Sequence, residues 1–217
     1  GTRYPEILSA AAAGGARVVR ASDEVVALLA ESVTPQGLVG VSRLVTGGLD
    51  DVIALRPRLV SVLAQARDPG NVGTVIRASD AAGAEAVVVS KGSVDVHNGK
   101  CVRASAGSLF HLPITADVPM TEALPALRAQ GLTLLAADGA GDVDLDAATD
   151  TGLLSRPVAW VFGNEARGLP EDVIGLVDEV VRVPLYGQAE SLNLAAAAAV
   201  CLYATAHAQR QPGGCRR

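Results

Sequence analysis

From residue 58 onward, short apolar runs alternate with segments whose apolar positions recur at the spacing of a helix. Leu59–Ala64 and Ala86–Val89 are predicted to be buried strands, and Val72–Ala82 between them is predicted to be a helix that ends at Gly83. A strand, a helix and a second strand in this order predict a right-handed crossover and a parallel sheet.

The same alternation continues along the chain and predicts an α/β domain with a parallel sheet. Further buried strands or strand candidates are expected at His111–Thr115, Thr133–Ala137, Val158–Phe162 and Val180–Pro184. Helices are expected over Cys101–Leu109 and Thr121–Ala129, after Pro170, and over an alanine-rich stretch that contains Ala195–Val200. The acidic segment Asp138–Asp150 is expected to be a loop.

The first 50 residues have a different pattern and are interpreted as a separate module. They predict a helix from Ser22 to about Ser32, a turn over residues 34–37, a strand over Leu38–Val45 and a flexible acidic junction at residues 47–51. Because Gly1 is not an initiator methionine, the module is interpreted as the end of a small α/β domain that lacks its beginning. The expected division is residues 1–50 for this partial domain and its linker, 51–208 for the main domain, and 209–217 for a disordered polar tail.

Two polar, glycine-bearing loops follow the last two predicted strands. Residues 163–168 follow Val158–Phe162, and residues 187–193 follow Val180–Pro184. Open α/β sheets place their ligand sites at the carboxyl ends of the strands, so these loops form the candidate active site. They carry Asn164, Glu165, Arg167, Glu190, Ser191 and Asn193.

A third polar segment precedes the helix over Val72–Ala82. Asn71 is placed to cap this helix, Gly73 permits the close approach of a ligand or another backbone, and Arg77 lies near the entrance. The alternative is a capped helix with a surface arginine. The spacing of Gly70 and Gly73 is not that of G-x-G-x-x-G, and no phosphate-binding P-loop is found, which argues against NAD and ATP.

Each of the two later loops also has a functional and a structural interpretation. Gly163, Asn164 and Glu165 indicate backbone exposed to a ligand, or else an ordinary polar turn before the next helix. Ser191 is a plausible N-cap of the last helix, whose free amides could receive an anion. A nucleophilic serine is disfavoured, because none of the three histidines stands in a recognisable triad context.

Composition narrows the class of partner. The chain has 217 residues, 49% hydrophobic and 3% aromatic, with a formal net charge of −5. A nucleic-acid partner would therefore be met by a local arginine patch, and base stacking on an aromatic platform is not expected. The three cysteines lack metal-site spacing, and neither a signal peptide nor a membrane span is apparent, so we expect a cytoplasmic protein without a metal.

The three polar segments, in this order and at these separations, resemble the SpoU family of RNA 2′-O-ribose methyltransferases in the SPOUT superfamily. The resemblance covers about residues 59–206. It is carried by these matches: Asn71 and Gly73 with Arg77, Gly163-Asn164-Glu165 with Gly168, Val183-Pro184, and Ser191-Leu192-Asn193, with Arg103–Gly107 as a secondary segment. Residues 33–39 look like the end of the ribosomal-protein-like RNA-binding domain that often precedes such a catalytic domain.

The resemblance implies a deep trefoil knot in the C-terminal part of the domain and a homodimer with its active site at the interface. It implies S-adenosylmethionine bound largely through backbone groups, at Gly163, Asn164, Val183, Pro184 and Leu192. Arg77 would act on the ribose 2′-hydroxyl or the adjacent phosphate. An arginine is a poor base at its usual pKa (~12.5–13.8), so orientation and charge stabilisation are favoured over proton removal.

The remaining residues of the predicted site would position Arg77, the loops and the ribose; these are Asn71, Glu165, Ser191 and Asn193. The expected substrate is ribosomal RNA, because of the N-terminal segment. Alternatives are a transfer RNA, an antibiotic-resistance role at a ribosomal site, and a non-catalytic RNA-binding module of the same fold. A nucleotide-dependent oxidoreductase would need the dinucleotide motif that the sequence lacks.

Overall fold

The computed structural model describes residues 4–30, 34–164 and 168–211. The chain forms two compact units, Gly1–Arg43 and Leu44–Arg217. The first unit holds α1 (Pro5–Ala13) and α2 (Asp23–Leu29). Ser22 caps α2 by accepting a hydrogen bond from the Val25 amide, as its hydroxyl predicts.

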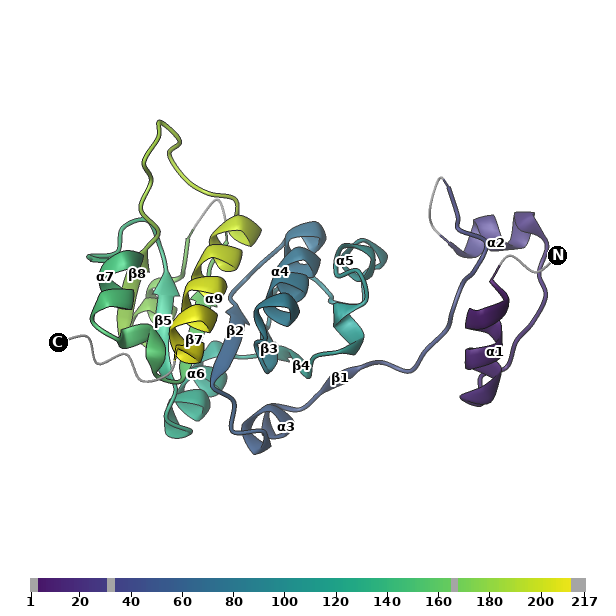
Figure 1. Cartoon of the computed structure of the whole chain (residues 1–217), viewed down its shortest axis with the longest axis horizontal. Helices are drawn as coiled ribbons and strands as arrows, with labels where there is room; N and C mark the ends of the chain where they lie inside the picture. The colour runs from purple at the N-terminus through teal and green to yellow at the C-terminus, as the bar shows by residue number, and fades with distance from the viewer. Residues whose placement is uncertain (1–3, 31–33, 165–167, 212–217) are drawn as a thin grey trace. The chain divides into compact units, whose positions relative to one another are not determined.

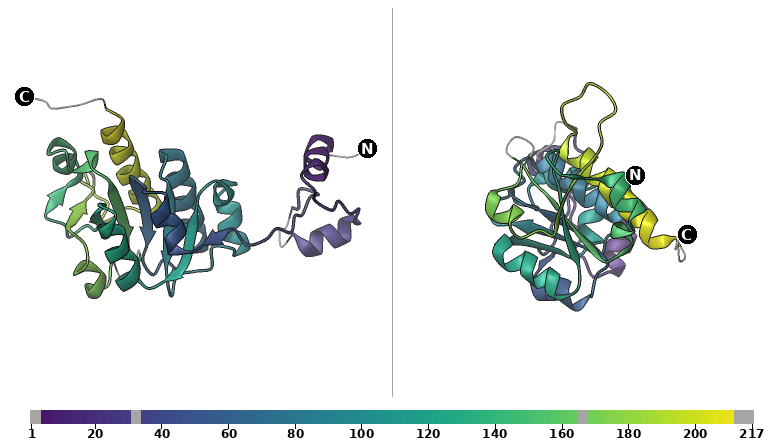
Figure 2. Two further views of the ribbon diagram at one scale, coloured as in Figure 1. Left: turned by 90° about the horizontal axis from the view of Figure 1, so that it is seen from below. Right: turned by 90° about the vertical axis from the view of Figure 1, so that its left-hand side faces the viewer.

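The second unit is a parallel sheet with helices on both faces (Figures 1 and 2). All pairings between its strands are parallel, in the order β1-β4-β3-β2-β7-β5-β8-β6. The elements follow the chain as β1 (Thr46–Gly47), α3 (Leu49–Ala54), β2 (Leu59–Leu63), α4 (Pro69–Ala82), β3 (Ala86–Ser90), α5 (Gly99–Ala104), η1 (Ser108–Phe110), β4 (Ile114–Val118), α6 (Met120–Ala129), β5 (Thr133–Ala137), β6 (Val143–Asp144), α7 (Leu145–Asp150), η2 (Leu153–Ser155), β7 (Val158–Phe162), α8 (Glu171–Ile174), β8 (Glu179–Arg182) and α9 (Leu194–Arg210).

The central strands divide their side chains between two cores. Leu59 and Leu63 of β2 join the core beneath α4 and α9, whereas Val60 and Val62 join the core beneath α3 and α6. This division follows from the two-residue period of a strand, and burial on both faces explains why four of the five residues of β2 are apolar. The fifth, Ser61, is buried with its hydroxyl 2.7 Å from that of Ser79. Trp160 of β7 reaches the first core, where its indole N–H donates to the buried Thr205 hydroxyl of α9 (2.8 Å).

Several expected elements differ from the structure. Residues 38–45 form no strand, and the described part of the first unit contains no strand with which they could pair. The junction predicted at residues 47–51 includes the first turn of α3, whose acidic residues favour a helix start. The acidic segment 138–150 contains β6, which pairs with β8, and α7, whose first turn is also acidic. The strand predicted at Val180–Pro184 is β8, of which only Val181 is buried.

The C-terminal helix is the predicted one, but it reaches Arg210, so residues 209 and 210 belong to its last turn. Arg210 donates to the Ala82 carbonyl at the end of α4 (3.1 Å). The remainder of the predicted disordered tail, residues 212–217, lies outside the described residues, as does Ser32. None of the helices in the described ranges is long and apolar enough to cross a membrane.

Candidate active site

The carboxyl ends of β2, β7 and β8 bring the three predicted polar segments to one edge of the sheet. Asn71 follows β2, Asn164 follows β7, and residues 183–193 follow β8. Because these strands are parallel, with β7 beside β2 and β5 between β7 and β8, the segments share that edge although they are far apart in sequence. In Figure 1 the segment between β8 and α9 extends beyond the ends of the strands.

Asn71 and Asn193 are in direct contact. Asn193 Nδ2 donates to Asn71 Oδ1 at 3.1 Å, and Asn193 Oδ1 accepts from the Ala195 and Ala196 amides at 2.9 and 3.4 Å. Asn193 is therefore the N-cap of α9, a role predicted for Ser191. Ser191 is exposed, two residues earlier, and its hydroxyl makes no hydrogen bond within the described part of the chain.

The start of α4 is capped by Asp68, where Asn71 was predicted. Asp68 Oδ1 accepts from the Asn71 amide at 2.9 Å, and Asp68 Oδ2 lies 3.1 Å from Lys100 Nζ. The Asn71 amide, followed by the Lys100 ammonium, holds the pKa of Asp68 below its ordinary value. The cap leaves the Asn71 side chain available to Asn193.

Asn164 and Gly163 hold the end of β7 against β2. Asn164 Nδ2 points to the Gln65 carbonyl at 3.4 Å, and the Asn164 and Gly168 backbones exchange two hydrogen bonds of 3.1 and 2.8 Å. A Cβ at Gly163 would come within 2.6 Å of the Gly168 carbonyl carbon, so only glycine fits there. Glu165 lies outside the described residues.

Arg77 is not brought to the Asn71–Asn193 contact. It is exposed, and it makes no hydrogen bond or ion pair with any described residue. Six residues correspond to about 9 Å along a helix and about 240° around it, so Asn71 and Arg77 leave α4 on different sides.

Gly73 packs against α5, where a Cβ would collide with the Cys101 carbonyl and Ala104.

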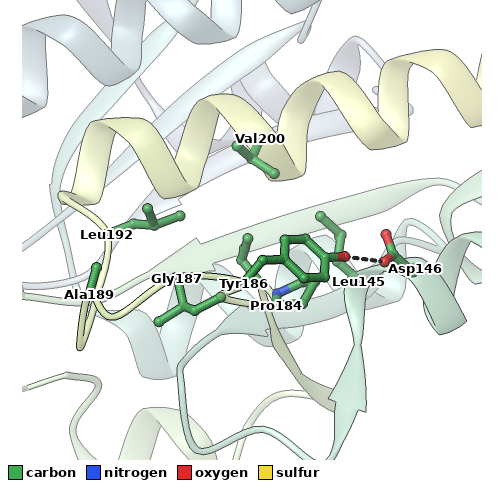
Figure 3. A pocket seen from close by; sticks show the side chains of 10 residues that line it. Leu145, Asp146, Pro184, Tyr186, Gly187, Ala189, Leu192 and Val200 are labelled. Carbon is green, nitrogen blue, oxygen red and sulfur yellow. Dashed lines mark hydrogen bonds between the residues drawn. The ribbon is translucent and has the colours of Figure 1, made fainter.

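A largely apolar cavity of about 450 Å³ lies between α7, α9 and the segment that follows β8 (Figure 3). Three predicted cofactor residues, Val183, Pro184 and Leu192, line it, whereas Gly163 and Asn164 do not. The other lining residues are Leu145, Asp146, Leu185, Tyr186, Gly187, Ala189 and Val200.

Two acidic residues near the start of α7 hold the end of β8 and the segment that follows it, and neither contact was predicted from the sequence. The Tyr186 hydroxyl donates to Asp146 Oδ2 at 2.9 Å, as Figure 3 shows, and Arg182 binds Asp144 through two nitrogens at 2.5 and 2.9 Å. The Asp146 hydrogen bond raises the pKa of Tyr186, and the Arg182 hydrogen bonds lower the pKa of Asp144. The acidic run alone indicated a solvated loop, so it carried no signal of these contacts.

The cysteines and the other metal-binding side chains form no further site in the described ranges. Cys101 and Cys201 are buried, and burial raises their thiol pKa values to about 11 and about 12. Both thiols are therefore protonated at neutral pH, which makes them poor nucleophiles. Within residues 4–30, 34–164 and 168–211, no three His, Cys, Asp or Glu side chains gather as a metal site would require.

Residues 58–203 match the model of the SpoU rRNA Methylase family. The chain is 33% identical over 205 residues to the 23S rRNA (guanosine(2553)-2'-O)-methyltransferase RlmP of Bacillus subtilis, covering 93% of this chain and 76% of that protein. It is 32% identical over 192 residues to the 23S rRNA (uridine(2479)-2'-O)-methyltransferase of Streptomyces viridochromogenes, covering 86% and 66% respectively.

Solved structures of methyltransferases are similar to this chain as well. The AdoMet-bound rRNA methyltransferase from Sinorhizobium meliloti superposes with a TM-score of 0.82 at 32% identity, over 94% of this chain and 77% of that one. The SpoU methyltransferase AviRb from Streptomyces viridochromogenes in complex with AdoMet gives 0.64 at 36% identity, over 72% and 63%. The chain thus spans between 63% and 77% of the length of these two structures.

Proposed function

The chain belongs to the SpoU rRNA Methylase family, and we propose that it transfers a methyl group from S-adenosylmethionine to a ribose 2′-hydroxyl of ribosomal RNA. The observation that carries the proposal is the Asn71–Asn193 contact, which joins two of the three polar segments at the carboxyl edge of the sheet. The third segment reaches the same edge through Asn164 and Gln65.

The residues present fit S-adenosylmethionine. The cavity of about 450 Å³ lies in the usual range for small-molecule sites, and its apolar wall, with Val183, Pro184 and Leu192, suits a base. Among the described residues, the amides from Leu185 to Leu192 donate to no other backbone group, which leaves them available to a ligand. Gly163 and Asn164 would support the site from the end of β7.

When bound, S-adenosylmethionine supplies a methyl group on a positively charged sulfur, which is already a good electrophile. The protein has to hold the 2′-hydroxyl in line and stabilise the oxygen as it loses its proton. We assign this to Arg77, whose guanidinium is exposed and makes no ion pair with a described residue. Its fixed positive charge orients the hydroxyl or the adjacent phosphate. Asn71 and Asn193 position α4, which carries Arg77. Glu165 and Ser191 position the loops and the ribose.

We further propose a homodimer whose interface completes the site. Leu185, Tyr186, Val200 and Tyr203 are exposed apolar or aromatic side chains, and the first three line the cavity. A second subunit that covered them would shield the cavity from water and approach the exposed Arg77. Sedimentation at micromolar concentration tests this assembly, and a purely monomeric protein would contradict it.

The deep trefoil knot is a proposal about the segment between β8 and α9. β8 lies beyond β5, whereas α9 packs against α4 on the far side of β7, so this segment returns across two strands. A return that passed through the loop after β7 would form the knot, and it would fix the backbone groups on which cofactor binding relies.

For the N-terminal residues 1–50, we propose the end of an RNA-binding domain with its linker, ahead of a methyltransferase domain at 51–208. Relatives named for 23S rRNA favour ribosomal RNA over transfer RNA and over a non-catalytic binding module. Such a substrate would place the enzyme in the cytoplasm.

Calorimetric titration of the purified chain tests the cofactor directly. S-adenosylmethionine is expected to bind with one site per chain, and NADH, which also carries an adenine nucleoside, is expected not to bind. Binding of NADH alone, or no binding by a folded protein, would contradict the proposed function.

A further inference from the structure

Gln65 has an unusual backbone for a residue with a side chain. It lies two residues after the end of β2, and its φ of +53° lies in the left-handed region that glycine occupies at much lower cost. The central strand β2 is thus followed by a strained residue at the edge where the predicted segments meet. Strained positions of this kind cluster at active sites and ligand clamps.

The backbone of Gln65 is held from both neighbouring strands. Its amide donates to Ser90 Oγ at the end of β3 (2.8 Å), and its carbonyl receives Asn164 Nδ2 from the loop after β7 (3.4 Å). Ser90 is buried and also contacts Ser93 Oγ at 3.0 Å. The Gln65 side chain is exposed, and its amide makes no hydrogen bond within the described part of the chain. The fold therefore fixes the backbone that carries this exposed amide group.

Two cations flank Gln65, and neither has a counter-ion among the described residues. Arg67 follows it by two residues, Lys91 follows the neighbouring β3, and neither forms an ion pair with a described residue. Two acidic groups of the loops after β2 and β3 have partners of their own: Asp68 is paired with Lys100, and Asp95 lies 3.3 Å from His97 Nδ1. By contrast, Arg128 and Arg182, on the other half of the sheet, are each paired with an aspartate.

The charge of the sequence follows the same division. Residues 58–110 contain six Lys or Arg and four Asp or Glu, whereas residues 111–182 contain four and twelve. A polyanion would therefore be attracted to the β2–β3 side of the domain and repelled from the β8–β6 side.

We propose that the carboxyl edge of β2 and β3 is the surface on which the RNA strand lies, with Gln65 as a direct contact to it. Arg67 and Lys91 hold the phosphates, since Coulomb attraction supplies most sequence-independent affinity. The Gln65 amide, which both donates and accepts, is suited to a base edge or a ribose hydroxyl of the strand. This inference rests on the proposed function and adds to it the surface that binds the substrate.

The test separates the amide of Gln65 from its backbone strain. Gln65→Gly removes both, whereas Gln65→Ala removes the amide and keeps a Cβ at positive φ. For both variants we expect KM for RNA to rise about three- to tenfold with kcat nearly unchanged, as for the loss of one hydrogen bond made equally in ground and transition states. S-adenosylmethionine affinity should stay at the wild-type value. If Gln65 serves only the backbone turn, the glycine variant will match or exceed the wild type in both parameters.

The cations are tested by the salt dependence of RNA binding, measured by fluorescence anisotropy with a labelled ribosomal RNA fragment. Arg67→Gln and Lys91→Gln should each reduce the slope of log K against log salt by about 0.7 to 0.9. The matched control is Arg156→Gln, an exposed arginine just before β7 at the opposite edge, which should leave the slope unchanged.

The two proposals fail in different ways. A wild-type protein that binds RNA but transfers no methyl group contradicts the proposed function only. Equal RNA affinities and equal salt slopes for the wild type, the Gln65 variants and the two cation variants overturn this inference, whether or not methyl transfer occurs.

Discussion

The side-chain amide of Asn193 donates to the side-chain oxygen of Asn71 at 3.1 Å, across 122 positions of sequence. Asn193 thus caps α9 and also binds Asn71 in the first turn of α4, so it links the N-terminal ends of the two helices. The contact gives a physical reason for an asparagine at position 193, because its amide nitrogen donates to Asn71 while its own oxygen accepts from the first amides of α9.

Substitutions of Asn193 separate its two roles. Asn193→Asp keeps the capping oxygen and loses the donor to Asn71, so its unfolding free energy should stay near the wild-type value while methyl transfer falls. Asn193→Ala loses both and should also be destabilised by about 1 kcal/mol. Urea unfolding and initial rates measure the two effects; equal activity of the aspartate variant and the wild type would show that the Asn71 contact is dispensable.

Arg77→Ala should abolish methyl transfer without weakening the fold or cofactor binding. The side chain is exposed and makes no hydrogen bond or ion pair with a described residue, so the melting temperature should change little. Arg77→Lys keeps the charge but loses the planar fork, so it should restore only part of the rate. Loss of S-adenosylmethionine binding in either variant would instead place Arg77 in the cofactor site.

Gly163→Ala should disturb the loop after β7, because a Cβ there would lie 2.6 Å from the Gly168 backbone. Overpacking of this kind costs about 1–3 kcal/mol, and the shift of the loop should weaken S-adenosylmethionine binding. Gly139→Ala is the control, since nothing lies within 4 Å of a Cβ at that position and Gly139 does not line the cavity. Calorimetry measures S-adenosylmethionine binding and thermal unfolding measures stability in both variants. Equal losses in the two variants would show that crowding at Gly163 is not the cause.

Asp68 should make the domain sensitive to acid. Its pKa is lowered in the folded state by the Asn71 amide and Lys100, so its contribution is present above the unfolded value of about 4. That contribution is lost as the pH falls through the lowered folded value. Asp68→Asn still caps α4 but does not titrate, so its urea midpoint should decline less than the wild-type midpoint below about pH 4. If the urea midpoints of the two proteins fall equally with pH, Asp68 does not contribute to the acid sensitivity of the domain.

The parallel sheet could be predicted because the apolar run of each central strand is buried on both faces. For β2 and β7 the sequence carries the signal itself, since Leu59–Leu63 and Val158–Phe162 contain scarcely a polar residue. The strand predicted over residues 38–45 was wrong, because alternating character alone does not supply a neighbouring strand. Helices α3 and α7 were missed because acidic residues indicate both a solvated loop and the first turn of a helix.

The sequence could predict which segments form the site, but not the hydrogen bonds between them. The position of Asn71, Asn164 and Asn193 at one edge follows from the expected parallel sheet. Their partners do not: that Asp68 caps α4, and that Tyr186 binds Asp146 across 40 residues, depends on how the chain folds back. The positive φ of Gln65 has no sequence signal either, because its backbone partners, Ser90 of β3 and Asn164 after β7, are distant in sequence.

The most direct test of the central claim is to locate the methyl group. The purified chain is incubated with isotope-labelled S-adenosylmethionine and deproteinised bacterial ribosomal RNA, and the nucleosides are separated after digestion and identified by mass spectrometry. We expect label on the ribose 2′-oxygen of a nucleotide in 23S rRNA, and none when Arg77→Ala replaces the wild type. Label on a base, or transfer that Arg77→Ala leaves intact, would contradict this expectation.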